Sequence, residues 1–228
     1  MGYTHKGLIS RRRFLAGGMT TVLAGCSVDL AERRSGLRLE VVPQVNKEQF
    51  DPQVIYASIQ DGDYTLPAVG LNKLKPQFRR QIVRSPVGSR PGNVVVDLAQ
   101  AHLYFIQANG FAVRYGIGIG REGFGWSGLG VINHVRSWPK WTPTPSMLSR
   151  HPELRVYRGG MAGGLENPLG ARALYIYQNG QDTLYRVHGT PEWWTIGRAM
   201  SSGCIRMLNQ DVIDLSQRVD ANARILVR

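Results

Sequence analysis

The stretch that decides both fold and chemistry lies toward the end of the chain. It reads Tyr185-Arg186-Val187-His188-Gly189-Thr190 and, after a link containing proline and tryptophan, Ser201-Ser202-Gly203-Cys204-Ile205-Arg206-Met207-Leu208-Asn209. Side chains alternate between the two faces of a strand, so the first segment predicts Tyr185 and Val187 on one face. Leu184, Arg186 and His188 are expected on the other face, where the imidazole can leave the core.

The spacing between His188 and Cys204 allows two neighbouring segments to meet. Sixteen positions separate the two residues, Gly189 allows the chain to turn, and Gly203 allows close backbone approach at Cys204. Arg206 falls on the same side as the sulfur if this segment is extended. The pattern therefore predicts that a thiol, an imidazole and a guanidinium converge.

These three groups have complementary chemistry. A thiol is a weak nucleophile until it loses its proton, so His188 is expected to act as base and to lower the apparent pKa of Cys204 below the roughly 8.5 of free cysteine. The backbone N–H groups of Gly203 and Cys204 are the expected oxyanion donors, with Ser202 and Gly189 in supporting positions. Arg206 offers a fork suited to a substrate carboxylate. The set indicates cysteine acyl transfer.

This pattern resembles the signature of the L,D-transpeptidase (YkuD-type) catalytic domain: a His-Gly pair, a gap of comparable length, then Ser-x-Gly-Cys-x-Arg. Val94 to Tyr104 resembles the opening hairpin of that family, and Asn167-Pro168-Leu169-Gly170 resembles the segment before its histidine strand. The resemblance covers residues 93–228. Many members carry histidine where this chain has Ser202, which leaves His188 as the base, and residues 121–165 do not match the common lid.

The resemblance implies a mainly β, β-sandwich-like catalytic domain with a short helix after the cysteine segment. It also implies ping-pong acyl transfer on peptidoglycan stem peptides, without a cofactor, in cell wall biogenesis. Cys204 would be acylated by the third stem residue with release of D-alanine. A stem amine, a protein lysine or a free D-amino acid would then accept the acyl group, and water would make the protein a carboxypeptidase.

The N-terminal residues are typical of an export signal. Ser10-Arg11-Arg12-Arg13-Phe14-Leu15 precedes an uncharged run from Ala16 to Gly25, resembles the twin-arginine signal, and is too short in its apolar part to span a bilayer. Leu23-Ala24-Gly25-Cys26 resembles a lipobox, which predicts a lipid anchor at Cys26; an ordinary signal peptide cut nearby is the alternative. Export would leave Cys204 an unpaired thiol in an oxidising compartment, the periplasm.

The remaining sequence divides into two parts. Residues 26–92 are punctuated by prolines and predict an extended linker with a strand or two, whereas residues 93–228 predict the catalytic domain. Strands are expected at Val94–Leu98, His102–Gln107, Phe111–Ile117, Leu129–Val135, Ala173–Gln178, Thr183–His188 and Arg224–Val227, with hairpins at Asn109-Gly110 and Asn179-Gly180.

Two further features concern the helix and the irregular region. A helix near the end is expected to begin with Asn209 as cap, with Asp211 in its first turn and Val212, Leu215 and Val219 on one side. Residues 126–170, which include Trp138 and Trp141, fit equally a binding lid or an aromatic cover for the sheet.

The net charge and the order of histidine and cysteine along the chain distinguish the rival functions. The formal charge is +12, and removing the four basic leader residues leaves +8, which suits nucleic acid, anionic lipid or an acidic polymer. Nucleic-acid binding conflicts with the leader, and a sortase would place its histidine farther upstream. No histidine follows Cys204, which excludes a papain-like order, and the histidines lack zinc-ligand spacing with a cysteine pair. A non-catalytic peptidoglycan-binding lipoprotein remains the alternative.

Overall fold

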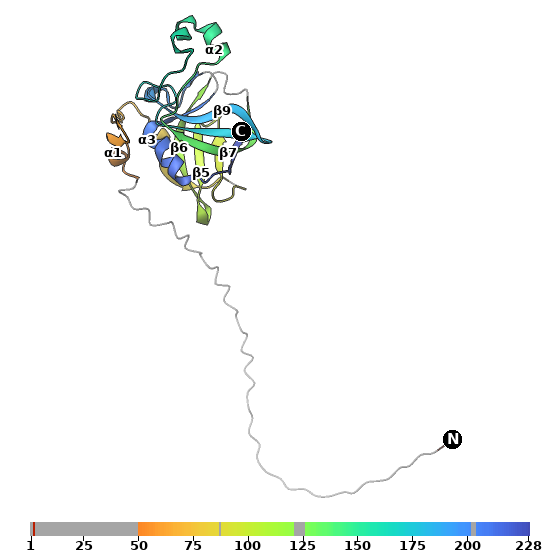
Figure 1. Cartoon of the computed structure of the whole chain (residues 1–228). Coiled ribbons are helices and arrows are strands. Elements are labelled where there is room, and N and C mark those ends of the chain that lie inside the picture. Colours follow the sequence, from red (N-terminus) through yellow and green to blue (C-terminus); the bar gives the residue numbers. More distant parts are fainter. Residues whose placement is uncertain (1, 3–49, 87, 121–125, 202–203) are drawn as a thin grey trace. The chain divides into compact units, whose positions relative to one another are not determined.

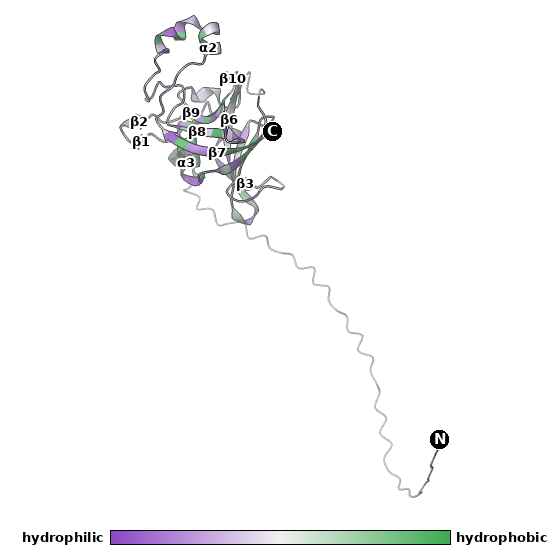
Figure 2. Cartoon of the chain, turned by 45° about the vertical axis from the view of Figure 1, so that its right-hand side comes forward, coloured by the Kyte–Doolittle hydropathy of each residue, from purple (hydrophilic) through white to green (hydrophobic). Residues whose placement is uncertain are grey.

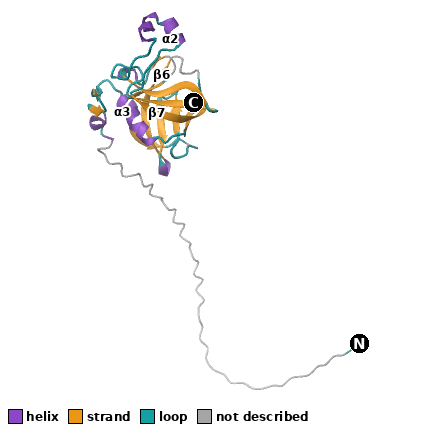
Figure 3. Cartoon of the chain, in the orientation of Figure 1, coloured by secondary structure: helices purple, strands orange, loops and turns teal. Residues whose placement is uncertain are grey.

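The described part of the chain is dominated by β-structure (Figure 3). The computed structural model describes residues 2, 50–86, 88–120, 126–201 and 204–228. Most strands join one large sheet. They are β3 (Gln81–Arg84), β4 (Val94–Asp97), β5 (His102–Ile106), β6 (Phe111–Gly120), β7 (Gly128–Ser137), β8 (Arg172–Gln178), β9 (Gln181–Thr190), β10 (Ala199–Ser201), β11 (Ile205–Leu208) and β12 (Ala223–Val227). The mainly β fold class expected from the sequence is confirmed.

The large sheet closes on itself through β6. Its strand order is β10-β6-β11-β9-β8-β7-β12-β4-β5, and β5 pairs again with β6. Closure creates one inner face that collects apolar side chains, and Figure 2 shows hydrophobic and hydrophilic patches mixed on the strands of this sheet. The centre of this core is fully buried and contains Val96, Leu103, Tyr115, Ile117, Leu174, Ile176 and Met207.

Two Asn-Gly turns join antiparallel neighbours as the sequence predicts. Asn109 and Gly110, in the 3-10 turn η3 (Ala108–Gly110), have φ of 63° and 77°. Asn179 and Gly180, between β8 and β9, have φ of 51° and 77°. Positive φ at both central positions matches the right-handed twist of a hairpin, and Asn and Gly adopt it readily. These turns fix the register of the strands that follow.

The helix α3 (Asn209–Arg218) follows β11 directly, as the predicted fold class requires, and packs against the sheet (Figure 1). Val212 and Leu215 are fully buried in the core, and Asp211 lies in the first turn. The expected cap is wrong, because the helix begins at Asn209 and Leu208 is its N-cap. The amide of Asn209 instead accepts from Ala171 N at 2.9 Å and donates to Thr190 O at 3.2 Å. It therefore ties the helix start to the ends of β8 and β9.

The segment before the large sheet is folded rather than simply extended. It contains α1 (Pro52–Ile55), the hairpin of β1 (Ile59–Asp61) and β2 (Tyr64–Leu66), and the turn η2 (Pro76–Phe78). β3 then pairs with β6, from Gln81 opposite Arg114 to Arg84 opposite Phe111. An apolar cluster that includes Tyr56 and Phe78 reaches Leu208 of β11. Part of the expected linker thus packs on the sheet that carries the site.

A buried ionic network fastens this segment to α3. Nη1 of Arg80 is 2.5 Å from a carboxylate oxygen of Asp214, which also accepts hydrogen bonds from Arg218 and Tyr115. Asp211 is fully buried 3.5 Å from Nε of Arg80 and accepts from Tyr56 at 3.2 Å. Burial raises the pKa of Asp211 to about 7, although the Arg80 charge opposes this shift.

The irregular region holds both packed and projecting parts. Trp138 packs on Leu66, Ala171 and Ile213, and its indole N–H donates to Asp61 at 2.8 Å. This packing agrees with the interpretation of Trp138 as an aromatic cover. By contrast, α2 (Pro145–Arg150) and the 3-10 helix η5 (Pro152–Tyr157) bury no residue and project from the sheet (Figure 1). Within the described ranges, no helix is long and apolar enough to cross a membrane.

Candidate active site

The neighbouring strands β9 and β11 position the predicted catalytic side chains. They run parallel, with Arg206 opposite His188 and Ile205 opposite Val187. Cys204 directly precedes β11, and the backbone of Arg186 donates a hydrogen bond toward its sulfur. The structure therefore brings Cys204, His188 and Arg206 to one region of the sheet.

A bulge in β9 changes the predicted side-chain alternation. Tyr175 of β8 faces Arg186, but Tyr177 faces Asp182, so extra residues are accommodated on β9. Leu184 lies in this bulge with φ of 63° and is 73% exposed, so its expected alignment with Arg186 and His188 is wrong. Val187 is buried in the core as predicted. The bulge ends before His188, and the catalytic stretch keeps its regular pairing with β11.

His188 is buried and held as the neutral base. Its Nδ1 lies 2.6 Å from the carbonyl oxygen of Gly189. A carbonyl only accepts, so Nδ1 carries the proton in this contact, and Nε2 is the unprotonated nitrogen of the neutral ring. The backbone of Pro168 is a second hydrogen-bond partner of the imidazole. Burial lowers the pKa of His188 to about 4; the Gly189 carbonyl opposes this, and the charges of Arg206 and Arg186 add to it. The imidazole is thus available as a base at neutral pH.

Cys204 is also favoured in its neutral form. Burial raises the pKa of its thiol, although the Arg186 backbone and the charges of Arg186 and Arg206 act in the opposite direction. The residue keeps part of its surface accessible. The sequence predicted that His188 lowers the pKa of Cys204, but these surroundings raise that pKa and favour the neutral thiol. The reason is desolvation, which penalises both the thiolate and the imidazolium.

Gly189 has a different purpose from the expected turn. The strand continues through it to Thr190, and a Cβ atom at Gly189 would stand 2.1 Å from the Asn209 side-chain oxygen and 3.1 Å from Ala171 N. Only glycine allows the Asn209 amide to reach both β8 and β9. Gly189 therefore supports the site through close packing next to His188.

Arg206 already contacts a carboxylate of its own chain. Its Nη1 donates to Glu192 at 2.7 Å and to the hydroxyl of Thr195 at 3.4 Å. The guanidinium side chain is 12% exposed, whereas that of Glu192 is 52% exposed. The Arg206 guanidinium, predicted to bind a substrate carboxylate, thus already binds the carboxylate of a residue that reaches solvent.

Arg186 is a feature of the site to which the sequence pattern assigned no role. Both terminal nitrogens of its guanidinium donate to Asp182 at 2.7 Å, and the group stacks 4.1 Å from the ring centre of Tyr175. Its charge opposes the raised pKa of Cys204. The sequence offered one signal for a role of Arg186, namely the alternation that places it on the same strand face as His188. Alternation could not reveal its ion pair with Asp182, because the bulge in β9 lies between the two residues.

Three predicted site residues lie outside the described part of the chain. These are the supporting Ser202, the oxyanion donor Gly203 and the lipidation candidate Cys26. Among the described residues, no group of three or more His, Cys, Asp or Glu side chains could hold a metal ion.

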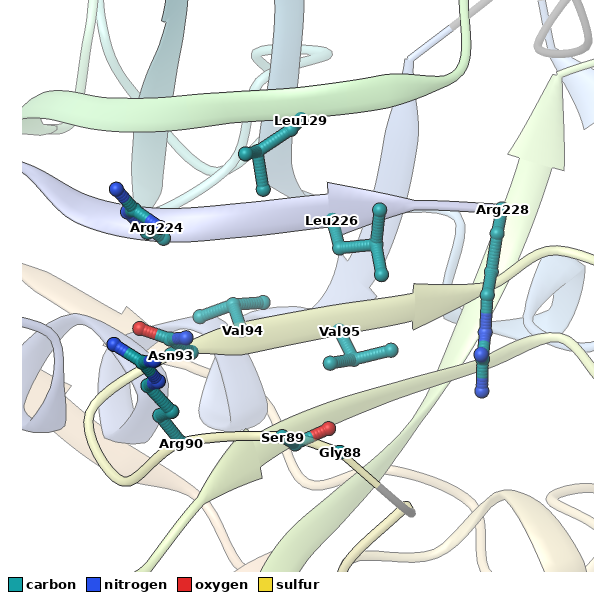
Figure 4. Close-up of a pocket in the computed structure, with 10 residues that line it drawn as sticks. All are labelled: Gly88, Ser89, Arg90, Asn93, Val94, Val95, Leu129, Arg224, Leu226 and Arg228. Carbon is teal, nitrogen blue, oxygen red and sulfur yellow. The ribbon is translucent and has the colours of Figure 1, made fainter.

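A separate cavity of about 260 Å³ lies on other strands (Figure 4). Its apolar floor includes Val95 of β4 and Leu226 of β12, and three arginines line it: Arg90, Arg224 and Arg228. β7 and β8 separate β12 from β9 in the sheet. The residues that line the cavity therefore do not include Cys204, His188 or Arg206.

Comparison with known proteins agrees with this geometry. The family model of the L,D-transpeptidase catalytic domain (YkuD) matches residues 91–227. The chain therefore belongs to the L,D-transpeptidase catalytic domain family.

Individual relatives extend the comparison. The chain is 31% identical over 174 residues to the probable L,D-transpeptidase ErfK/SrfK of Escherichia coli K12, covering 72% of this chain and 51% of that protein. It is 30% identical over 141 residues to the probable L,D-transpeptidase YbiS of the same strain, covering 58% and 43%. It thus spans about half the length of these curated relatives.

Solved structures give a looser match. A crystal structure from Brucella melitensis, described as a probable carnitine operon oxidoreductase, has 43% sequence identity, covers 64% of this chain and 91% of its own, and has a TM-score of 0.48. An Enterococcus faecium L,D-transpeptidase mutant has 15% identity, coverage of 61% and 50%, and a TM-score of 0.43.

Proposed function

We propose that this protein is a peptidoglycan L,D-transpeptidase that transfers a stem peptide through Cys204. The observation that carries the proposal is the parallel pairing of β9 and β11, which sets Arg206 opposite His188 immediately after Cys204. Family membership supports the same activity. The substrate would be a tetrapeptide stem, and the product a 3–3 crosslink or a stem attached to another amine.

The first half-reaction forms a thioester. The proton of the Cys204 thiol passes to Nε2 of His188 as the sulfur attacks the carbonyl carbon of the third stem residue. The bond to the terminal D-alanine breaks, and the leaving nitrogen takes the proton from His188. Because both groups begin neutral, charge develops only during the attack, next to the Arg186 and Arg206 cations.

The second half-reaction returns the enzyme to its starting state. The acceptor amine attacks the thioester carbon and gives a proton to His188, which passes it back to the leaving sulfur. Arg206 binds a carboxylate of the stem through its planar fork. Water in place of the amine would give carboxypeptidase activity.

Replacement of the nucleophile tests this proposal. Cys204→Ala should abolish D-alanine release from a disaccharide tetrapeptide while the protein stays folded, because the thioester cannot form without the Cys204 sulfur. Products are identified by mass, and near-ultraviolet circular dichroism confirms the fold. Turnover that persists in folded Cys204→Ala protein would contradict the assignment of Cys204 as nucleophile. Stem binding without any turnover by the wild-type protein would instead favour a non-catalytic peptidoglycan-binding protein.

We also propose that the protein is exported to the periplasm and tethered by lipid at Cys26. The twin-arginine-like segment Ser10 to Leu15 and the Leu23-to-Cys26 sequence support this proposal. A fatty-acid probe should label the full chain in cells, and Cys26→Ser should remove the label. An unlabelled wild-type protein that is soluble in the periplasm would show that the lipobox match has no function.

A further inference from the structure

The two arginines of the active site hold their carboxylate partners in different ways. Arg186 makes a two-pronged contact with Asp182, with both N–O distances at 2.7 Å. Arg206 contacts Glu192 through Nη1 alone, also at 2.7 Å. Within the described residues, the other guanidinium nitrogens of Arg206 make no hydrogen bond. One arginine is therefore saturated by its partner, and the other keeps donors available.

The Glu192 side chain reaches solvent, whereas its backbone is tied down by hydrogen bonds. Its N–H donates to the Thr190 hydroxyl at 3.1 Å, and its carbonyl accepts from the Thr195 hydroxyl at 2.7 Å. The carboxylate, in contrast, is 52% exposed. A single-pronged ion pair whose carboxylate side is half exposed contributes little stability, so exchange of the carboxylate on Arg206 need not disturb the turn that carries Glu192.

Arg206, by contrast, is held in place. It belongs to β11 between β6 and β9, and its Cβ packs against Gly118, where an added Cβ would stand 3.5 Å away. Its side chain is only 12% exposed. The arginine is thus largely enclosed by the sheet, whereas the glutamate side chain beside it is half exposed to solvent.

We propose that Glu192 is an internal competitor for the substrate-carboxylate site: it occupies Arg206 in the free enzyme and is displaced by the carboxylate of the incoming stem peptide. This inference rests on the proposed function. An incoming carboxylate can form the two-pronged contact that Glu192 does not make, which favours the exchange. Asp182 does not compete in this way, because it already uses both terminal donors of Arg186.

Binding of a tetrapeptide stem to Cys204→Ala protein tests the exchange without turnover. Adding Glu192→Gln should tighten binding about two- to fivefold, the range equivalent to losing a weak surface ion pair. Glu153→Gln is the charge-matched control, because Glu153 is exposed on η5 and its ion-pair partner within the described ranges is His151. It should leave the dissociation constant unchanged. The unfolding midpoint of each variant verifies that the fold is retained.

A double-mutant cycle separates displacement from general repulsion of an anion. If Glu192 acts by occupying Arg206, Glu192→Gln should give no gain in protein that also carries Arg206→Ala. An equal gain in that background, or unchanged or weaker binding by Glu192→Gln itself, would overturn the proposal. Failure of the parent Cys204→Ala protein to bind the stem, together with no wild-type turnover, would instead reject the transpeptidase assignment.

Discussion

At the residue scale, the surroundings of Cys204 predict a slow thiol. Burial raises its pKa, so the thiolate fraction at pH 7 should be below that of free cysteine, and alkylation by iodoacetamide should be correspondingly slow. His188 is neutral at this pH and supplies no cation, so His188→Ala should leave the alkylation profile largely unchanged. The same variant should lower acyl transfer by about 10²- to 10⁴-fold, because the base is missing.

The pH dependence of turnover checks the same site. His188 acts as a base only when deprotonated, and its pKa of about 4 places the loss of activity below that pH rather than near 6.5. A kcat/KM profile with an acid limb near pH 6.5, or fast alkylation that His188→Ala abolishes, would show instead a thiolate–imidazolium pair. Arg186→Gln provides a contrast, because losing that cation should raise the thiol pKa further.

At the element scale, the strands were predictable because their signals are local. Apolar alternation and Asn-Gly turns are each defined by a few consecutive residues. The observed bounds of β4, β5, β6, β8 and β12 are accordingly close to the predicted ones. The pairing of β3 with β6 and the bulge at Leu184 could not be predicted in this way. Both depend on partners distant in sequence or on a neighbouring strand, as does the bond from Asn209 to Ala171.

The helix α3 carries two aspartates that should respond differently to neutralisation. Asp214 accepts from Arg80, Arg218 and Tyr115, so Asp214→Asn should cost about 3–5 kcal/mol of unfolding free energy by breaking a buried ionic network. Asp211 is not hydrogen-bonded to Arg80, so Asp211→Asn should cost about 1 kcal/mol or less at pH 8. Urea unfolding of both variants measures the difference.

The pH dependence of stability gives α3 a second test. Burial raises the pKa of Asp211 to about 7, so its protonated form stabilises the fold below the unfolded pKa of 3.8, and this contribution is lost as the pH rises toward 7. Asp211→Asn should remove that slope, which appears as the difference between variant and wild type from pH 4 to 7. Parallel curves for the two proteins would indicate that Asp211 ionises normally.

At the scale of the whole molecule, the fold extends beyond the family match. The family model begins at residue 91, yet β3 covers residues 111–114 of β6, and Tyr56 is only 1% exposed in an apolar cluster that reaches β11. Arg80 also supplies the charge that faces Asp211 and Asp214. Removing this segment would expose the edge of the central strand and would take Arg80 away from the buried Asp211 and the partly buried Asp214.

We therefore expect residues 91–228 to unfold at a markedly lower temperature than residues 50–228, or to aggregate. The physical reason is the combined loss of strand pairing, apolar burial and the Arg80 ion pair, each of which alone costs on the order of 1 kcal/mol or more. Arg80→Met in residues 50–228 separates the causes, because it removes the charge and keeps β3. Equal unfolding temperatures for residues 50–228 and residues 91–228 would mean that residues 50–90 add no stability to the sheet. A drop for residues 91–228 that Arg80→Met largely reproduces would place the effect in the ionic network, whereas a small effect of Arg80→Met would assign it to β3 and the Tyr56 cluster.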